Sequence, residues 1–227
     1  MYSGGKDSTL AIEYAMNKGY TIKYLLSVKP TRTDCYLFHY ATVEHTGELA
    51  KILGLKHILI SCGVANPVKE ANLVKDAVLN EDKIDALILG GIGLQLTQLG
   101  SLQKALLPLG VEVYASHAGS DHETLFREML DKGYEILISQ VASDGLIKWL
   151  GKTITTENFE DLKKDSIKYG FHLGFEGGMA DTLVLDGPIF NEKLEILDSV
   201  KVIESEYNGH VVINNLKVVN KSLLKVN

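Results

Sequence analysis

The chain has 227 residues, of which 45% are hydrophobic and 23% are charged, and its formal net charge is −6. This composition is typical of a folded protein with one large or two small domains and excludes an intrinsically disordered chain. The acidic balance and the lack of a dense Lys/Arg run argue against direct binding to nucleic acid. Cys35 and Cys62 form no CxxC pair, which fits a reducing compartment. No apolar run approaches a membrane span and the start does not resemble a signal peptide, so we expect a cytoplasmic protein with no membrane partner.

The first half of the sequence alternates between helical and strand-like patterns. Helices are expected at residues 8–18, 42–53, 67–80 and 95–107, and strands at 20–28, 56–61, 84–90 and 111–116. The run IDALILG at 84–90 is almost continuously apolar, as in a strand that is covered on both faces. Strands that alternate with helices predict a parallel α/β sheet with right-handed crossovers.

The second half follows a different pattern. Helices are expected at 121–133 and 156–170, and strands at 134–142, 181–190, 200–207 and 210–219. The last two runs flank Asn208-Gly209, which is a strong hairpin signal. We therefore expect an α/β protein with two domains: a Rossmann-like parallel domain at 1–117 and a smaller α+β domain at 118–227.

A candidate phosphate-binding loop lies within the first ten residues. It reads SGGKDS and consists of Ser3, Gly4, Gly5, Lys6, Asp7 and Ser8. A Walker A loop is excluded, because Asp7 separates Gly5-Lys6 from Ser8 and no glycine lies five residues before Gly5. The two glycines allow positive φ and a close approach of the backbone to a ligand. Successive N–H groups at the start of a helix bind anions.

The other side chains of this loop suit a nucleotide. Ser3 and Ser8 supply hydroxyl groups, Lys6 can balance phosphate charge, and Asp7 can orient its neighbours or hold a magnesium ion. The structural alternative is a Gly-Gly turn with Asp7 or Ser8 as a helix N-cap. The six-residue match directly before a helix favours a nucleotide site. Such a loop normally follows a strand, but only two residues precede it here, which leaves a lost strand or a shortened start as alternatives.

SGGKDS resembles the PP-loop of the N-type ATP pyrophosphatases, which cleave ATP between the α- and β-phosphates and activate a group as its adenylate. Three other segments resemble the diphthine–ammonia ligases of this family. FEGGMADTLVLDGPIF (175–190) resembles their GEGGExxTLVLDxPLF block, GLIKWLGK (145–152) their GL…LGR stretch, and CYLFH (35–39) their SYMFH segment. The resemblance covers nearly the whole chain, and the length matches the short archaeal-type members.

This resemblance implies a ligase that uses ATP, Mg²⁺ and ammonium to amidate diphthine on translation elongation factor 2. The carboxylate would react through an acyl adenylate, with release of AMP and pyrophosphate. Lys6, Asp7 and Glu176 are the expected catalytic residues, and Asp7 is the expected magnesium ligand. The sequence leaves open whether the protein forms a homodimer.

Further binding residues are expected around the nucleotide and the substrate. For the nucleotide, they are the residues of the SGGKDS loop together with His39, Gly90 and Gly91; for the substrate, they are Glu176, Gly177, Gly178 and Thr182. Each has a structural alternative: a core histidine for His39, strand-end or loop turns for the glycines, a solvated loop acid for Glu176 and a turn cap for Thr182. Asp186 is expected to make a turn and Trp149 to lie in the core.

Four departures from the family pattern keep other readings open. Met179 replaces the second glutamate of EGGE, Phe175 replaces a glycine, and Lys152 replaces an arginine and so loses its bidentate fork. The stretch QLTQL (95–99) keeps only Gln98 of the family's SxYQR. The alternatives are a divergent paralogue that binds ATP or AMP without amidation, and a PP-loop amidase that acts on another carboxylate.

Overall fold

The structure is a computed structural model that describes residues 1–32, 43–91 and 96–221. Its contacts divide the chain into two compact units. The first unit contains Met1–Ser3, Asp7–Lys51 and Leu55–Gly119, and the second contains Gly4–Lys6, Ile52–Gly54 and Ser120–Asn227. The SGGKDS loop therefore contributes Gly4, Gly5 and Lys6 to the second unit. No helix in the described ranges is long and apolar enough to cross a membrane.

The part of the chain before residue 120 alternates strands and helices in sequence order. Its strands are β1 (Leu25–Pro30), β2 (His57–Cys62), β3 (Ala86–Leu89) and β4 (Glu112–Ala115). Its helices are α1 (Lys6–Asn17), η1 (Val43–His45), α2 (Thr46–Leu53), α3 (Pro67–Leu79), α4 (Leu96–Leu106) and η2 (Leu107–Leu109). Helix α1 begins two residues earlier than expected, so the last three residues of SGGKDS form its first turn.

The strands of the first unit pair in parallel, as expected. β1 pairs with β2, and β3 pairs with β4. Residues 1 and 2 join these two pairs, because the Tyr2 N–H donates to the Leu26 carbonyl (2.8 Å) and the Met1 amine donates to the Ile88 carbonyl (2.8 Å). The resulting order is β2, β1, residues 1–2, β3, β4, which is the order of a doubly wound sheet with the loop at its centre.

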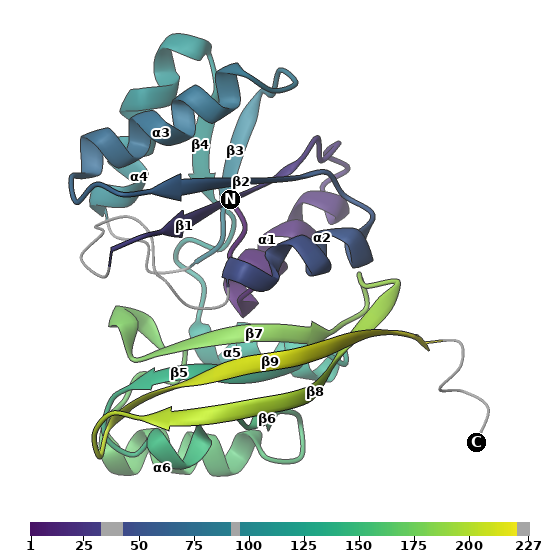
Figure 1. Cartoon of the computed structure of the whole chain (residues 1–227), viewed down its shortest axis with the longest axis vertical. Helices are drawn as coiled ribbons and strands as arrows, with labels where there is room; N and C mark the ends of the chain where they lie inside the picture. Colours follow the sequence, from purple (N-terminus) through teal and green to yellow (C-terminus); the bar gives the residue numbers. More distant parts are fainter. Residues whose placement is uncertain (33–42, 92–95, 222–227) are drawn as a thin grey trace. The chain divides into compact units, whose positions relative to one another are not determined.

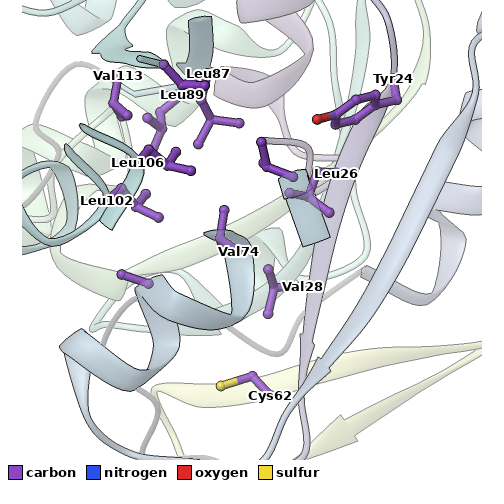
Figure 2. Packing of buried hydrophobic residues seen from close by; sticks show 13 residues of the cluster. Tyr24, Leu26, Val28, Cys62, Val74, Leu87, Leu89, Leu102, Leu106 and Val113 are labelled. Atoms are coloured by element: carbon purple, nitrogen blue, oxygen red, sulfur yellow. The ribbon is translucent and has the colours of Figure 1, made fainter. Parts of the chain in front are cut away.

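The core of the first unit lies between these strands and helices α3 and α4. Leu102 and Leu106 of α4 are fully buried and lie beside Leu87, Leu89 and Val113 of β3 and β4 (Figure 2). Each such side chain contributes about 1.5–3 kcal/mol when it leaves water. This core holds β3 in place, and Gly90 at the end of β3 lies against the loop.

The second unit is an antiparallel sheet packed with two helices (Figure 1, green to yellow). Its helices are α5 (His122–Asp131), η3 (Ile147–Trp149), α6 (Phe159–Tyr169) and η4 (Glu176–Gly178). Its strands are β5 (Glu135–Ala142), β6 (Thr153–Ile154), β7 (Ala180–Asp186), β8 (Glu192–Ile203) and β9 (Asn208–Asn220). The strand order is β6, β5, β9, β8, and β7 also pairs with β5.

The terminal hairpin is present, but its turn is not where the dipeptide signal predicted it. β8 ends at Ile203, and Asn208 and Gly209 already begin β9. The turn is closed by the Glu204 and Ser205 N–H groups, which both donate to the Asn208 carbonyl (3.0 and 3.1 Å). A side chain at Gly209 would stand 2.7 Å from the Val202 carbonyl oxygen, so the glycine is required by close packing within the ladder.

Candidate functional site

In the first unit, two hydroxyl groups tie the ends of the SGGKDS loop together. The Ser3 N–H donates to Ser8 Oγ at 3.2 Å, and the two Oγ atoms are 3.1 Å apart. Ser8 is buried in the first turn of α1. Because the first N–H groups of a helix have no partner within the helix, this turn can donate to an anion.

Gly90, at the end of β3, lies against this first turn. A Cβ at Gly90 would overlap the carbonyl of Asp7 and the nitrogen of Ser8, closer than real Cβ atoms come. Gly91 follows with a φ of 121°, which L side chains rarely adopt. The structure thus brings Gly90 to the loop, and a role of both glycines in nucleotide binding stays a prediction.

In the second unit, Gly4 and Lys6 hydrogen-bond to β7. Gly4 has a φ of 81°, and its carbonyl accepts the Val184 N–H at 2.9 Å. The Lys6 N–H donates to Thr182 Oγ1 at 3.1 Å, across 176 positions of sequence. Thr182 and Val184 belong to the TLVLD strand, so the two most specific motifs of the sequence contact each other. Thr182, expected at the substrate, holds the loop backbone here.

The Lys6 side chain is buried in the second unit. It is only 4% exposed, and its Nζ donates to the Gly174 carbonyl at 2.8 Å. The same Nζ lies 5.9 and 5.8 Å from the ring centres of Phe126 and Phe175, within the range of cation–π attraction. The ammonium group, expected to balance phosphate charge, is thus enclosed by a carbonyl and two rings.

Residues 174–179 are here called the EGG loop, and three of them have a positive φ. These are Phe175 (64°), Gly177 (74°) and Gly178 (77°). Glu176 stands between them, and its Oε1 lies 3.5 Å from Nδ1 of His122. Its side chain is 30% exposed, so the carboxylate remains open to a ligand. Met179 ends the loop and accepts the His172 N–H at its sulfur (3.1 Å).

His122 and His172, which were not predicted as site residues, contact the EGG loop and hold its backbone. The rings of His122 and His172 meet edge to face with centres 4.5 Å apart. His172 Nδ1 accepts the Gly174 N–H at 3.1 Å, and a Cβ at Gly174 would lie 2.5 Å from His122 Nδ1. Fifty positions separate these histidines, so no spacing rule could have paired them.

The structure also describes two other residues for which the sequence predicted a structural role. Asp186 accepts the Gly187 N–H at 2.7 Å and pairs with Lys221, which agrees with the expected turn. Trp149 is 4% exposed and donates to Asp165 at 2.8 Å, which places it in the core as expected. His39 lies in 33–42, outside the described residues.

A magnesium site would have few protein ligands. Within the described residues, no group of three or more His, Cys, Asp or Glu could hold a metal ion. Magnesium usually takes one or two carboxylates and completes its shell with phosphate oxygens and water. Asp7 lies in the first turn of α1, and its role as a magnesium ligand stays a prediction.

Comparison with known proteins gives two family matches. The Diphthamide synthase N-terminal domain matches residues 1–105, and the Diphthamide synthase C-terminal domain matches residues 121–219. The diphthine–ammonia ligase of Rattus norvegicus is 29% identical over 227 residues, covering 90% of this chain and 84% of its own length. The Mus musculus ligase is 28% identical with the same coverage. A solved structure, described as a predicted subunit of tRNA methyltransferase from Methanocaldococcus jannaschii, aligns with a TM-score of 0.42 and 17% identity over 83% of this chain and 96% of its own.

Proposed function

This chain belongs to the diphthamide synthase family, and we propose that it is an ATP-dependent diphthine–ammonia ligase. It has three substrates: ATP, ammonium, and the diphthine residue of translation elongation factor 2. We assign residues 1–117 to ATP binding and residues 118–227 to the protein substrate. The observation that carries the proposal is the hydrogen bonding of Gly4 and Lys6 to the TLVLD strand, because it brings the nucleotide motif to the motif that distinguishes these ligases.

The nucleotide end of the site is built from backbone groups. The SGGKDS loop and the positive end of α1 bind the β- and γ-phosphates, while the N–H groups of Ser3 and Lys6 hold the loop in shape by donating to Ser8 and Thr182. Gly90 and Gly91 line the same crevice, and His39 is proposed to join them. Where magnesium accompanies the nucleotide, Asp7 would hold it, and the ion would supply charge that offsets the phosphates.

The reaction proceeds in two displacements. An oxygen of the diphthine carboxylate attacks the α-phosphorus of ATP, and the bond to the β-phosphate oxygen breaks to release pyrophosphate. Ammonia then attacks the acyl carbon, AMP leaves with the oxygen it shared with the carboxylate, and the nitrogen loses a proton to give the amide. Stabilisation of the leaving phosphates by fixed N–H donors is the main contribution that this loop can make.

The acceptor end of the site lies at the EGG loop. Diphthine carries a trimethylammonium group near the carboxylate, and the partly exposed Glu176 supplies a negative charge for it. Gly177 and Gly178 allow the backbone to approach the ligand closely. Because this substrate is a translation factor, we place the reaction in the cytoplasm.

The test is a reconstituted reaction with diphthine-bearing elongation factor, ATP, Mg²⁺ and ¹⁵N-ammonium. We expect ¹⁵N in the elongation factor and one AMP per amide, measured by mass spectrometry and nucleotide chromatography. The matched control is Gly5→Val, which puts a branched side chain into the loop and should abolish both products. ADP as the main product, or AMP without amide, would exclude this function in favour of a different ATPase or of another carboxylate substrate.

A further inference from the structure

We propose that Lys6 is a positioning residue that anchors the SGGKDS loop beside the EGG loop, and that its ammonium group does not contact the phosphates of ATP. The inference rests on the proposed function, because it describes how the same site is held. It replaces the expectation that the charge of Lys6 balances the nucleotide.

The first argument for this proposal comes from the groups that surround the Lys6 ammonium. Its Nζ donates to the Gly174 carbonyl at 2.8 Å and lies below 6 Å from the ring centres of Phe126 and Phe175. Phe126 is 1% and Phe175 is 5% exposed, and their rings meet edge to face at 5.9 Å. We call this group of Gly174, Phe126 and Phe175 the lysine cage. A 4% exposed lysine inside the cage has no path to a ligand without leaving these partners.

His122 and His172 hold the backbone of the lysine cage in place. Its carbonyl belongs to Gly174, whose N–H donates to His172 Nδ1, while the Phe175 N–H donates to the His172 carbonyl at 2.8 Å. His122 packs on Gly174 and faces Glu176. The acceptor of the lysine is thus fixed by the same two histidines that support the EGG loop.

The conformation of Phe175 supports the same conclusion. Its φ of 64° makes it the non-glycine residue with positive φ among the described residues. Such backbone strain persists only where the surroundings compensate for it. Burial of the ring against Phe126 and the Lys6 ammonium is the compensation visible here.

The anchor has a consequence for the site. The Lys6 N–H and the Gly4 carbonyl are tied to β7, and the Lys6 side chain is tied to Gly174. The loop backbone is therefore held at two points beside Glu176. Loss of the side-chain anchor should loosen the N–H donors that bind phosphate, although the lysine itself touches no phosphate.

Lysine acetylation of the unmodified protein tests this directly. The protein is treated with the N-hydroxysuccinimide ester of acetic acid with and without ATP and Mg²⁺, and labelled lysines are quantified by mass spectrometry. We expect Lys6 to stay unlabelled in both conditions, while the exposed Lys104 of α4 is labelled in both. Labelling of Lys6 without ATP that ATP prevents is the behaviour of a phosphate ligand and would overturn the proposal.

A double-mutant cycle on ATP affinity provides the second measurement. Lys6→Met removes the anchor and Phe175→Leu removes one ring of the lysine cage, so each should weaken ATP binding, the first by about tenfold. The double variant should be little worse than Lys6→Met alone, because the ring acts only through the lysine. Additive losses would overturn the proposal, because independent roles add. If Lys6→Met does not fold, Phe175→Leu carries the test, since unchanged ATP affinity in that variant contradicts an anchor.

These experiments separate the proposal from the assigned function. Neither of them uses the elongation factor, so a failure of amidation leaves their outcome unchanged. If the wild-type protein does not bind ATP, the proposed function fails, and the labelling of Lys6 in the free protein still decides whether the cage exists. Lys104→Met is the control variant for the affinity measurements and should leave ATP binding unchanged.

Discussion

Gly90 and Gly174 are glycines because other atoms stand where a Cβ would be. At Gly90 these are backbone atoms of Asp7 and Ser8, and at Gly174 they are atoms of the His122 ring. Backbone atoms cannot move aside as the end of a flexible side chain can. Substitution at Gly90 therefore acts on the first turn of α1, where the proposed phosphate donors lie.

We predict that Gly90→Ala weakens ATP binding by about tenfold or more and lowers the thermal midpoint, because the added methyl group displaces the donors. Calorimetric titration with ATP and Mg²⁺ measures the first effect and thermal unfolding the second. Gly100→Ala is the control, since a Cβ there meets nothing within 4 Å. In the interior of α4 it should stabilise the protein by roughly 0.5–1 kcal/mol. Equal ATP affinity in both variants would show that the end of β3 does not contribute to the nucleotide site.

We predict that Met179→Glu raises the amidation rate by about tenfold, because a second carboxylate near Glu176 would attract the trimethylammonium group of diphthine. Methionine offers that cation only a polarisable surface. Glu176→Gln should lower the rate by a similar factor, and the exposed Glu157→Gln is the matched control. Rates are measured as ¹⁵N incorporation into elongation factor at saturating ATP. If neither substitution changes the rate while ATP binding is intact, the EGG loop does not contact diphthine.

Helix α5 contacts both the acid of the EGG loop and the ammonium group of Lys6. His122 and Phe126 are four residues apart and share a face of the helix. The first faces Glu176 and the second forms a wall of the lysine cage. Asp121 caps this helix, since its Oδ1 accepts the N–H and the hydroxyl of Thr124 at 2.8 and 2.7 Å. These two hydrogen bonds, the backbone one first, hold the pKa of the Asp121 carboxyl below its ordinary value of 3.8.

This lowered pKa predicts an acid-dependent loss of stability at the start of α5. A carboxyl with a lowered folded-state pKa stabilises the fold above its unfolded-state pKa, and the contribution is lost as pH falls through the folded-state value. Asp121→Asn keeps a capping oxygen but does not titrate in this range. The wild-type free energy of unfolding should therefore fall more steeply than that of the variant below about pH 4, in denaturant titrations. Parallel curves would contradict a capping role for the ionised form.

The whole molecule combines two kinds of sheet. The parallel strands of the first unit carry a loop at their carboxyl ends, which is where open α/β sheets bind ligands. The antiparallel sheet of the second unit carries β7 and the EGG loop that precedes it. Since ATP should bind the folded chain and not the unfolded one, its affinity is coupled to stability.

We predict that ATP with Mg²⁺ at about 100 times its dissociation constant adds about 2.7 kcal/mol of stability. For a chain of this length the thermal midpoint should rise by roughly 5–10 °C. Differential scanning fluorimetry measures the shift, and Gly5→Val should show none at the same ATP concentration. A shift that Gly5→Val retains would place the nucleotide away from the SGGKDS loop.

The local features of the chain and its family could be predicted from the amino-acid sequence. Periods of alternating strands and helices predicted the parallel first part and the α+β second part, because the side-chain pattern of an element follows from its own backbone geometry. The SGGKDS loop and the TLVLD block were also readable, since each is a continuous run with its own chemistry. The turn of the β8–β9 hairpin was placed wrongly, because Asn208-Gly209 satisfies a packing requirement within the ladder as well as a turn rule.

Which of these residues contact each other became known from the three-dimensional structure. Lys6 and Thr182 are 176 positions apart, and neither spacing nor composition relates them. The burial of Lys6, its carbonyl partner Gly174 and the pairing of His122 with His172 depend on how α5 and β7 pack. From the sequence alone, a lysine in a phosphate-binding motif is expected to neutralise the charge of the ligand. Those surroundings are long-range contacts, and long-range contacts are set by the packing of whole elements and not by local propensity.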